Sequence, residues 1–125
     1  MIADDHPVVR RSLKELVEDT GLIAVVAEAS DGIEALDIVR RTALDLVLLD
    51  LNMPRKGGLE TLIELKREHP SLPVLIISGH CVQHYAPRLV KLGAAGFISK
   101  EDAPDHLVKT IHSAMAEASG ITFQR

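Results

Sequence analysis

The most restrictive feature of the sequence is a short apolar run that ends in an aspartate. Residues 46–49 read Leu-Val-Leu-Leu, and Asp50 follows them directly. An apolar run of this length, bounded by turn signals, is typical of a strand buried on both faces of a parallel sheet. A proline and a glycine pair then interrupt regular structure, so residues 50–57 are predicted to form a shaped loop. Asp50 is therefore expected at the C-terminal end of a central strand, where open α/β sheets bind ligands.

The rest of the chain alternates between strand-like and helix-like patterns. Strands are predicted at residues 1–3, 23–27, 46–49, 74–78 and 96–99. Helices are predicted from Pro7 to Gly21, from Asp31 past Val39, at 59–68, at 87–92 and from Pro104 to Gly120. Five such repeats imply right-handed crossovers and an α/β fold with a doubly wound five-stranded parallel sheet. A strand order such as 2-1-3-4-5 would place a crevice between the first and third strands.

The predicted helices each carry an apolar face with helical spacing. The expected inward residues are Val9, Leu13, Leu16, Val17, Ala35, Leu36, Val39, Leu59, Leu62, Ile63, Leu107, Ile111, Ala114, Met115 and Ala118. The chain has 125 residues, the size of one domain, and 46% of them are hydrophobic, which is enough for a core. We expect residues 1–119 to form this domain and residues 120–125 to begin a C-terminal tail or linker.

Composition restricts the classes of function. The formal net charge is −4, which argues against direct nucleic-acid binding by this domain, because phosphate contacts need clustered Lys and Arg. Cys81 is the only cysteine, so no disulfide can form within the chain, as is usual for a cytoplasmic protein. The sequence has neither a signal peptide nor an apolar run that would span a membrane.

Polar side chains stand where four of the predicted strands end. Asp4 and Asp5 follow the first strand, Asp50 the third, Ser78 the fourth and Lys100 the fifth. Three carboxylates in one crevice repel one another unless a cation offsets them, and hard oxygen ligands favour Mg²⁺ or Mn²⁺ over zinc. A carboxylate beside a divalent cation, a lysine and a hydroxyl is suited to accept a phosphoryl group.

These motifs resemble the receiver domain of two-component response regulators over nearly the whole chain. The matching stretches are Ile-Ala-Asp-Asp-His-Pro at 2–7, Leu-Asp-Leu-Asn-Met-Pro at 49–54 with the glycines at 57 and 58, Ser78, and Gly-Ala-Ala-Gly-Phe-Ile-Ser-Lys at 93–100. The Asp-Asp-His-Pro motif at 4–7, and Lys100 followed by Pro104, resemble the motifs of one subgroup of the family. Members of that subgroup usually carry a LuxR-type helix-turn-helix output domain. The resemblance implies a flavodoxin-like fold.

The resemblance also implies a role for each matching residue. Asp50 would accept phosphate from a sensor histidine kinase, with Mg²⁺ (or Mn²⁺) held by Asp5, Asp50 and the backbone carbonyl of Asn52. Asp4 would act through a metal-bound water. Ser78 would hydrogen-bond the phosphoryl group and Lys100 would pair with it. Ser78 and Phe97 would form the switch that changes the surface of the fourth helix, fifth strand and fifth helix. The domain would not be an enzyme beyond its own phosphorylation and dephosphorylation.

The implied partners are the kinase and an output domain outside this chain, which the subgroup resemblance implies to be DNA-binding. A homodimer on phosphorylation stays open. No membrane partner is expected, and the implied location is cytoplasmic. The chain departs from the family in two further ways. Its first strand is cut short, which would weaken the centre of the sheet. Phe97 lacks the hydroxyl of the tyrosine that the family often has there, so switching would rest on packing alone.

Three other functions share part of this pattern of residues. A haloacid-dehalogenase-type phosphatase also uses an Asp nucleophile, but its nucleophile precedes the acid pair and Asn52 stands where its second Asp would be. A pseudo-receiver that only binds partners usually lacks one of the acids. A flavodoxin-like FMN protein would need a Ser/Thr-rich phosphate loop after the first strand. His80, Cys81 and His84 fit no zinc spacing, Cys81 has no basic neighbour that would activate it, and His6 is predicted to be a helix-entry residue.

Overall fold

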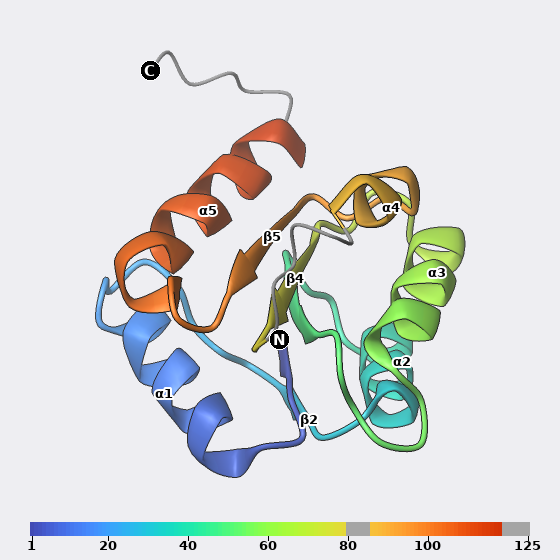
Figure 1. Cartoon of the computed structure of the whole chain (residues 1–125), viewed down its shortest axis with the longest axis horizontal. Helices are drawn as coiled ribbons and strands as arrows, with labels where there is room; N and C mark the ends of the chain where they lie inside the picture. The colour runs from blue at the N-terminus through green and yellow to red at the C-terminus, as the bar shows by residue number, and fades with distance from the viewer. Residues whose placement is uncertain (80–85, 119–125) are drawn as a thin grey trace.

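The computed structural model describes residues 1–79 and 86–118 of the chain, and its architecture is a three-layer α/β sandwich (Figure 1). The strands are β1 (Ile2–Ala3), β2 (Glu28–Ala29), β3 (Val47–Asp50), β4 (Val74–Ser78) and β5 (Gly96–Ser99). The helices are α1 (Pro7–Glu18), α2 (Gly32–Arg41), α3 (Gly58–Glu68), α4 (Ala86–Lys91) and α5 (Ala103–Ala118). All strand pairs are parallel in the order β2-β1-β3-β4-β5, which confirms the predicted fold.

The centre of the sheet is as apolar as the sequence requires. Every residue of β3 and β4 is buried, and β3 runs beside β4 with Asp50 opposite Ile77. Parallel strands that are covered on both faces need such continuous apolar runs. Because Asp50 ends β3 and Ser78 ends β4, both side chains lie at the same edge of the sheet.

The two faces of the sheet carry two separate hydrophobic cores. Helices α1 and α5 cover one face, and α2, α3 and α4 cover the other (Figure 1). Alternate residues of the strands supply the two cores, as the period of a strand demands. Leu49 and Ile76 belong to the core under α2 and α3, while Leu48 and Leu75 belong to the core under α1 and α5.

The helix starts follow local signals in the sequence. His6 is the N-cap of α1 and Pro7 is its first residue, as predicted for a proline near a helix entry. Asp31 is the N-cap of α2, and its Oδ1 accepts a hydrogen bond from the backbone N–H of Glu34 at 2.9 Å. Among the residues described, none of the helices is both long and apolar enough to cross a membrane.

The second strand was predicted at the wrong residues. Residues 23–27 were expected to form it, but β2 consists of Glu28 and Ala29. The parallel register places Ile2 opposite Glu28, so β1 offers no residue opposite residues 23–26. A strand needs a partner for its backbone groups, and high β-propensity alone does not supply one.

Smaller corrections concern the helices. Helices α4 and α5 each begin one residue before the proline that was expected to open them. Ile63 was predicted to be buried but is 43% exposed, and Leu65 occupies the inner face of α3 instead. Ile38 and Ala116 are buried without having been predicted. The tail at 120–125 lies outside the described residues, so the proposed end of the domain at residue 119 stays a prediction.

Candidate functional site

The polar residues singled out in the sequence meet at the C-terminal edge of the sheet. Asp4 directly follows β1, Asp50 ends β3, Ser78 ends β4 and Lys100 follows β5. Backbone hydrogen bonds hold these strand ends together. For example, the N–H of Lys100 donates to the carbonyl of Ser78 at 2.8 Å. The site is therefore built on the strands themselves, with neighbouring strands fixing its geometry.

Lys100 lies between two buried carboxylates. Its Nζ is 3.2 Å from Oδ2 of Asp4 and 3.4 Å from Oδ2 of Asp50. The side chains of Asp4 and Asp50 are 0% and 2% exposed, whereas that of Lys100 is 23% exposed. One ammonium group thus faces two carboxylates. When both carboxylates are ionised, the three groups together carry an excess negative charge in a place that water hardly reaches.

The protonation of Asp50 reflects this crowding. Burial, and next the negative charge of Asp4, raise the pKa of Asp50 above its ordinary value. The backbone N–H of Asn52, which donates to Oδ1 of Asp50 at 3.2 Å, and the ammonium of Lys100 act in the opposite direction. A further cation at this site would favour the ionised carboxylate, which is the form that can act as a nucleophile.

Asp4, Asp5, His6 and Asp50 form a cluster that is suited to a metal ion. Each offers a ligand atom, and these atoms lie within 4.8 Å of one another. Oδ2 of Asp4 and Oδ1 of Asp5 are buried and accept no hydrogen bond from the described residues, although they face Lys100 Nζ and His6 Nδ1 at ion-pair distance. Carboxylate oxygens that are buried and short of donors fit a hard divalent cation.

The imidazole of His6 is a part of the site that the sequence did not predict. Its Nδ1 lies 3.2 Å from Oδ1 of Asp4 and 3.0 Å from Oδ1 of Asp5, and its backbone N–H donates to Oδ1 of Asp4 at 2.9 Å. The expected helix-entry role is confirmed, but the contacts of the ring are additional. The only signal was its position directly after the acid pair.

The remaining predicted residues lie around this centre. Ser78 is fully buried, whereas Asn52 is exposed on the loop that follows Asp50. Phe97 is half-buried and packs against the core beneath α2 and α3. His80, Cys81 and His84 lie outside the described residues.

The loop after Asp50 is anchored to α2 by residues that the sequence did not single out. Nε and Nη2 of Arg55 donate to Oδ2 of Asp31, the Nε contact being 2.8 Å long. The backbone N–H of Glu34 first, and then Arg55, lower the pKa of Asp31 below its usual value. The carbonyl of Lys56 accepts from the N–H of Gly32 at 3.1 Å. One side-chain contact and one backbone hydrogen bond thereby fix the loop to the start of α2.

Gly58 allows the same loop to pack tightly against the backbone of Asp50. A Cβ at this position would lie 2.2 Å from the backbone oxygen of Asp50 and 2.6 Å from Cα of Leu51. The N–H of Gly58 donates to the carbonyl of Leu51 at 3.0 Å, which closes the loop onto its own start. Only glycine fits here, and the reason is the space that a side chain would need. The backbone of Gly58 is helical, a conformation that other residues also adopt.

A parallel sheet of this order with an acid cluster and a lysine at its C-terminal edge defines a protein of the phosphoacceptor receiver class. Residues 1–112 match the model of the response regulator receiver domain, and the chain belongs to this family. The family assignment favours the receiver over the phosphatase and FMN alternatives.

Individual relatives agree with the assignment. The chain is 36% identical over 125 residues to the nitrate/nitrite response regulator protein NarP of Escherichia coli, covering 100% of this chain and 58% of that protein. It is 35% identical over 113 residues to the response regulator UvrY of Escherichia coli, covering 90% of this chain and 52% of that protein. The structure of a LuxR-family two-component response regulator from Aurantimonas sp. matches with a TM-score of 0.89 and 35% identity, over 94% of this chain and 84% of that one. The chain spans just over half the length of these curated relatives.

Proposed function

We propose that Asp50 is the residue that accepts a phosphoryl group, and that a sensor histidine kinase donates it. The observation that carries this proposal is the position of Lys100, whose Nζ lies 3.4 Å from Oδ2 of Asp50. A cation held there can neutralise charge on the oxygens of the transferring group. The pocket also excludes most water from the Asp50 carboxylate, which is 2% exposed.

The reaction makes one bond and breaks one. An oxygen of the Asp50 carboxylate attacks phosphorus, and the bond from phosphorus to the donor's histidine nitrogen breaks, so that an acyl phosphate and a free imidazole result. Lys100 then pairs with the phosphoryl oxygens instead of with the bare carboxylate. Ser78, at the end of the neighbouring strand, supplies a hydroxyl to the same group.

We further propose that Mg²⁺ or Mn²⁺ is bound by Asp5, Asp50 and the backbone carbonyl of Asn52, with Asp4 acting through a bound water. The two buried carboxylate oxygens that accept no hydrogen bond from described residues support this ligand set. When bound, the ion supplies positive charge that stabilises the attacking carboxylate and the transferred group.

Labelling with a small phosphodonor tests the proposed acceptor. In the presence of Mg²⁺ and acetyl phosphate, the intact mass of the parent is expected to rise by one phosphoryl group, and brief alkali is expected to remove it. Asp50→Asn retains the shape of the side chain but lacks the nucleophilic carboxylate, so it is expected to stay unlabelled. Equal labelling of Asp50→Asn would exclude Asp50, and an unlabelled parent would favour the pseudo-receiver alternative.

Removal of one proposed metal ligand is expected to weaken Mg²⁺ binding. Asp5→Ala deletes a carboxylate from the cluster, so we expect the dissociation constant for Mg²⁺ to rise by about tenfold or more. Isothermal titration calorimetry measures this, and Asp37→Ala is the matched control, since the Asp37 side chain is 68% exposed and pairs with Arg41 on the surface of α2. An unchanged affinity in Asp5→Ala would remove Asp5 from the ligand set.

The proposed output is a change in the surface formed by α4, β5 and α5. Val90 on α4 is 60% exposed, and Phe97 on β5 is only half-buried, so this surface already offers apolar side chains to a partner. Movement of Ser78 toward the phosphoryl group would leave space that Phe97 can fill by changing rotamer. Phe97 has no hydroxyl to hold the second state, so we expect an incomplete transition.

Amide hydrogen exchange with and without beryllofluoride locates this change. We expect altered protection of amides in residues 86–92 and 97–103. Changes restricted to α1 and α2, with α4 unaffected, would place the output surface elsewhere.

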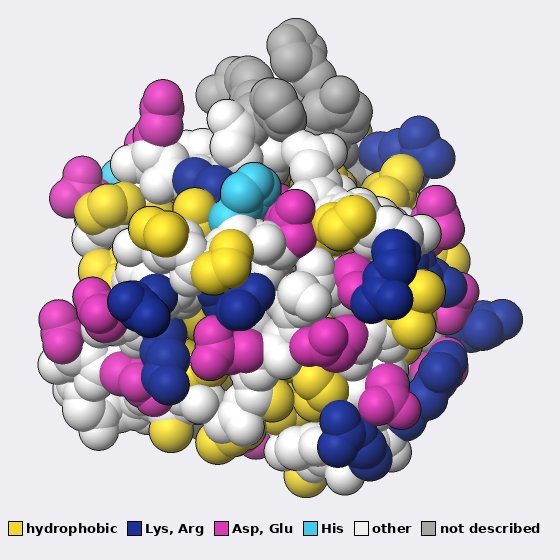
Figure 2. Space-filling view, turned by 90° about the horizontal axis from the view of Figure 1, so that it is seen from below, with side chains coloured by type: hydrophobic (Ala, Val, Ile, Leu, Met, Phe, Trp, Pro, Cys, Tyr) yellow, Lys and Arg dark blue, Asp and Glu magenta, His cyan; other side chains and the backbone are white. Residues whose placement is uncertain are grey.

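The family supports a proposal for the partners and the location. Two relatives among the solved structures are named as LuxR-family regulators, one of them DNA-binding. We propose that an output domain of this kind receives the signal, that a homodimer forms on phosphorylation, and that the protein works in the cytoplasm. Figure 2 shows a face on which Lys and Arg side chains are interspersed with Asp and Glu side chains, so this face forms no uniform basic surface for nucleic acid.

A further inference from the structure

Among the residues described, His6 is the histidine whose ring lies within ion-pair distance of carboxylates. Its Nδ1 is 3.0 Å from Oδ1 of Asp5 and 3.2 Å from Oδ1 of Asp4. The contact with Asp4 has the geometry of a hydrogen bond, whereas Oδ1 of Asp5 accepts no hydrogen bond from the described residues. Nδ1 of His6 and Oδ1 of Asp5 thus lie side by side without being directed at each other, as two ligands of one ion do.

The backbone around His6 holds the ring in this position. A residue that precedes proline is restricted to extended conformations, and His6, before Pro7, has φ −97° and ψ 107°. Its N–H donates to Oδ1 of Asp4 at 2.9 Å. Although His6 is the N-cap of α1, its side chain makes no capping hydrogen bond. The chain itself therefore turns the ring toward the acid pair, and the start of the helix does not use it.

The separations between these atoms match the coordination shell of a small divalent ion. Neighbouring ligands of an octahedral ion with bonds of about 2.1 Å lie about 3.0 Å apart. Imidazole nitrogen binds Zn²⁺ at a similar length, about 2.0–2.1 Å. The distances from Nδ1 of His6 to the two carboxylate oxygens are of this size. The ligand atoms of Asp4, Asp5, His6 and Asp50 lie within 4.8 Å of one another, so the whole group faces one small volume.

An imidazole in this group changes which ions the group prefers. Carboxylate and carbonyl oxygens suit Mg²⁺, whereas imidazole nitrogen suits first-row transition ions such as Ni²⁺ and Zn²⁺. Asp4 is fully buried, and its Oδ2 accepts no hydrogen bond from the described residues. Lys100 faces both Asp4 and Asp50, so one ammonium offsets two buried carboxylates. The site thus combines unmet negative charge with a nitrogen ligand.

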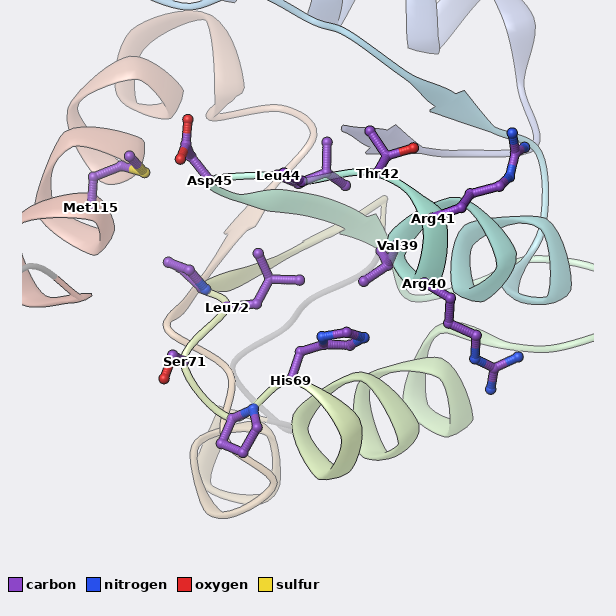
Figure 3. Close-up of a pocket in the computed structure, with 13 residues that line it drawn as sticks. Val39, Arg40, Arg41, Thr42, Leu44, Asp45, His69, Ser71, Leu72 and Met115 are labelled. Atoms are coloured by element: carbon purple, nitrogen blue, oxygen red, sulfur yellow. The ribbon is translucent and has the colours of Figure 1, made fainter.

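His69 is a histidine that lacks such partners. It lines a cavity of about 730 Å³ at the opposite edge of the sheet, between the segments that precede β3 and β4 (Figure 3). Nε2 of His69 is buried and has no hydrogen-bond partner among the described residues. In the described parts of the chain, His69 belongs to no group of three or more potential metal ligands, whereas His6 does. The carboxylates beside His6, and not the imidazole alone, therefore point to an ion.

We propose that His6 is a metal ligand, and that its Nδ1, with the carboxylates of Asp4 and Asp5, binds first-row transition ions of the Co²⁺, Ni²⁺ and Zn²⁺ group. Nδ1 releases its proton to solvent when the ion binds, and Nε2 takes one from solvent, so that the imidazole stays neutral. Water has access to the ring, because the side chain of His6 is 61% exposed. The inference rests on the metal site proposed above, since Asp5 belongs to both ligand sets.

Titration calorimetry with Co²⁺ and with Mg²⁺ tests the role of His6. His6→Ala is expected to raise the dissociation constant for Co²⁺ by at least about tenfold, since even the loss of a group that only orients a ligand often costs that much. The same variant should change the affinity for Mg²⁺ by less than about twofold, because Mg²⁺ takes oxygen ligands. Asp5→Ala is expected to weaken the binding of both ions. His112→Ala, which removes an exposed histidine from α5, should weaken neither.

Two calorimetric results would overturn the inference. One is Co²⁺ binding by His6→Ala that is as tight as in the parent. The other is an equal loss of Co²⁺ and Mg²⁺ affinity in His6→Ala, which would mean that the ring only orients the carboxylates. In the first case, Mg²⁺ binding that still needs Asp5 would leave the proposed Mg²⁺ site standing. Conversely, Co²⁺ binding that needs His6, in a parent that does not bind Mg²⁺, would support His6 as a ligand and exclude the Mg²⁺ site.

Nuclear magnetic resonance of the imidazole nitrogens provides a measurement on the parent chain that needs no variant. When Zn²⁺ is added, Nδ1 of His6 is expected to lose its proton and to acquire the chemical shift of a metal-bound nitrogen, with the remaining proton on Nε2. The ring of His112 should not change. A His6 ring that keeps its proton on Nδ1 in saturating Zn²⁺ would also overturn the inference.

Discussion

Lys100→Ala is expected to lower the rate of phosphorylation by about 100-fold or more, the usual effect of removing one preorganised charge that stabilises a transition state. Lys100 is the described cation that faces both Asp4 and Asp50, at 3.2 Å and 3.4 Å. Without it, two buried carboxylates repel each other, so we also expect the melting temperature of this variant to depend more steeply on Mg²⁺. The rate is measured by intact mass after timed exposure to acetyl phosphate.

Lys109→Ala is the matched control for this loss. Lys109 is an exposed lysine on α5, so its removal alters the net charge equally but leaves the site intact. A Lys100→Ala rate equal to that of Lys109→Ala would contradict the assigned role. Circular dichroism in Mg²⁺ establishes that the variant is folded, so that a slow rate reports on the site.

Gly58→Ala is expected to destabilise the domain by about 3 kcal/mol, at the upper end of what overpacking usually costs. The added methyl group would lie 2.2 Å from the carbonyl oxygen of Asp50 and 2.9 Å from that of Leu51, and neither backbone atom can move without moving the loop. Chemical denaturation measures the loss of free energy of unfolding. Because the clash involves Asp50 itself, the variant should also be phosphorylated more slowly.

The adjacent glycine is a control for the same substitution. A Cβ on Gly57 would have no atom of the described residues within 4 Å. Gly57 is the N-cap of α3, and alanine is a poorer N-cap than glycine, so Gly57→Ala should cost less than about 1 kcal/mol. Equal stability of the two variants would contradict the claim that the Asp50 carbonyl leaves no room for a methyl group on Gly58.

The positions of Asp4, Asp50 and Lys100 could be predicted because their signals are local. Each follows a short apolar run, and parallel strands end at one edge of the sheet once the alternation with helices is established. The fold then brings together residues that are 46 and 50 positions apart without any further information. Their distances from one another could not be obtained in this way, because these depend on the packing of side chains.

The prediction of β2 failed because strand formation is a property of pairs. The β-branched residues at 23–26 fit a strand, but β1 provides no backbone opposite them. The contact between Arg55 and Asp31 escaped prediction for a related reason, since it joins residues 24 positions apart. Arg55 adopts a positive φ of 61°, which few non-glycine residues do, and its sequence context gave no sign of this.

Direct mapping of the phosphorylated residue tests the central claim. After labelling with acetyl phosphate and Mg²⁺, borohydride reduces an aspartyl phosphate to a stable product that peptide mass spectrometry can locate. We predict that the modification is found on Asp50 alone, in the peptide that contains Asn52 and Met53. Modification of Asp4, Asp5 or His6, with Asp50 unmodified, would contradict the account.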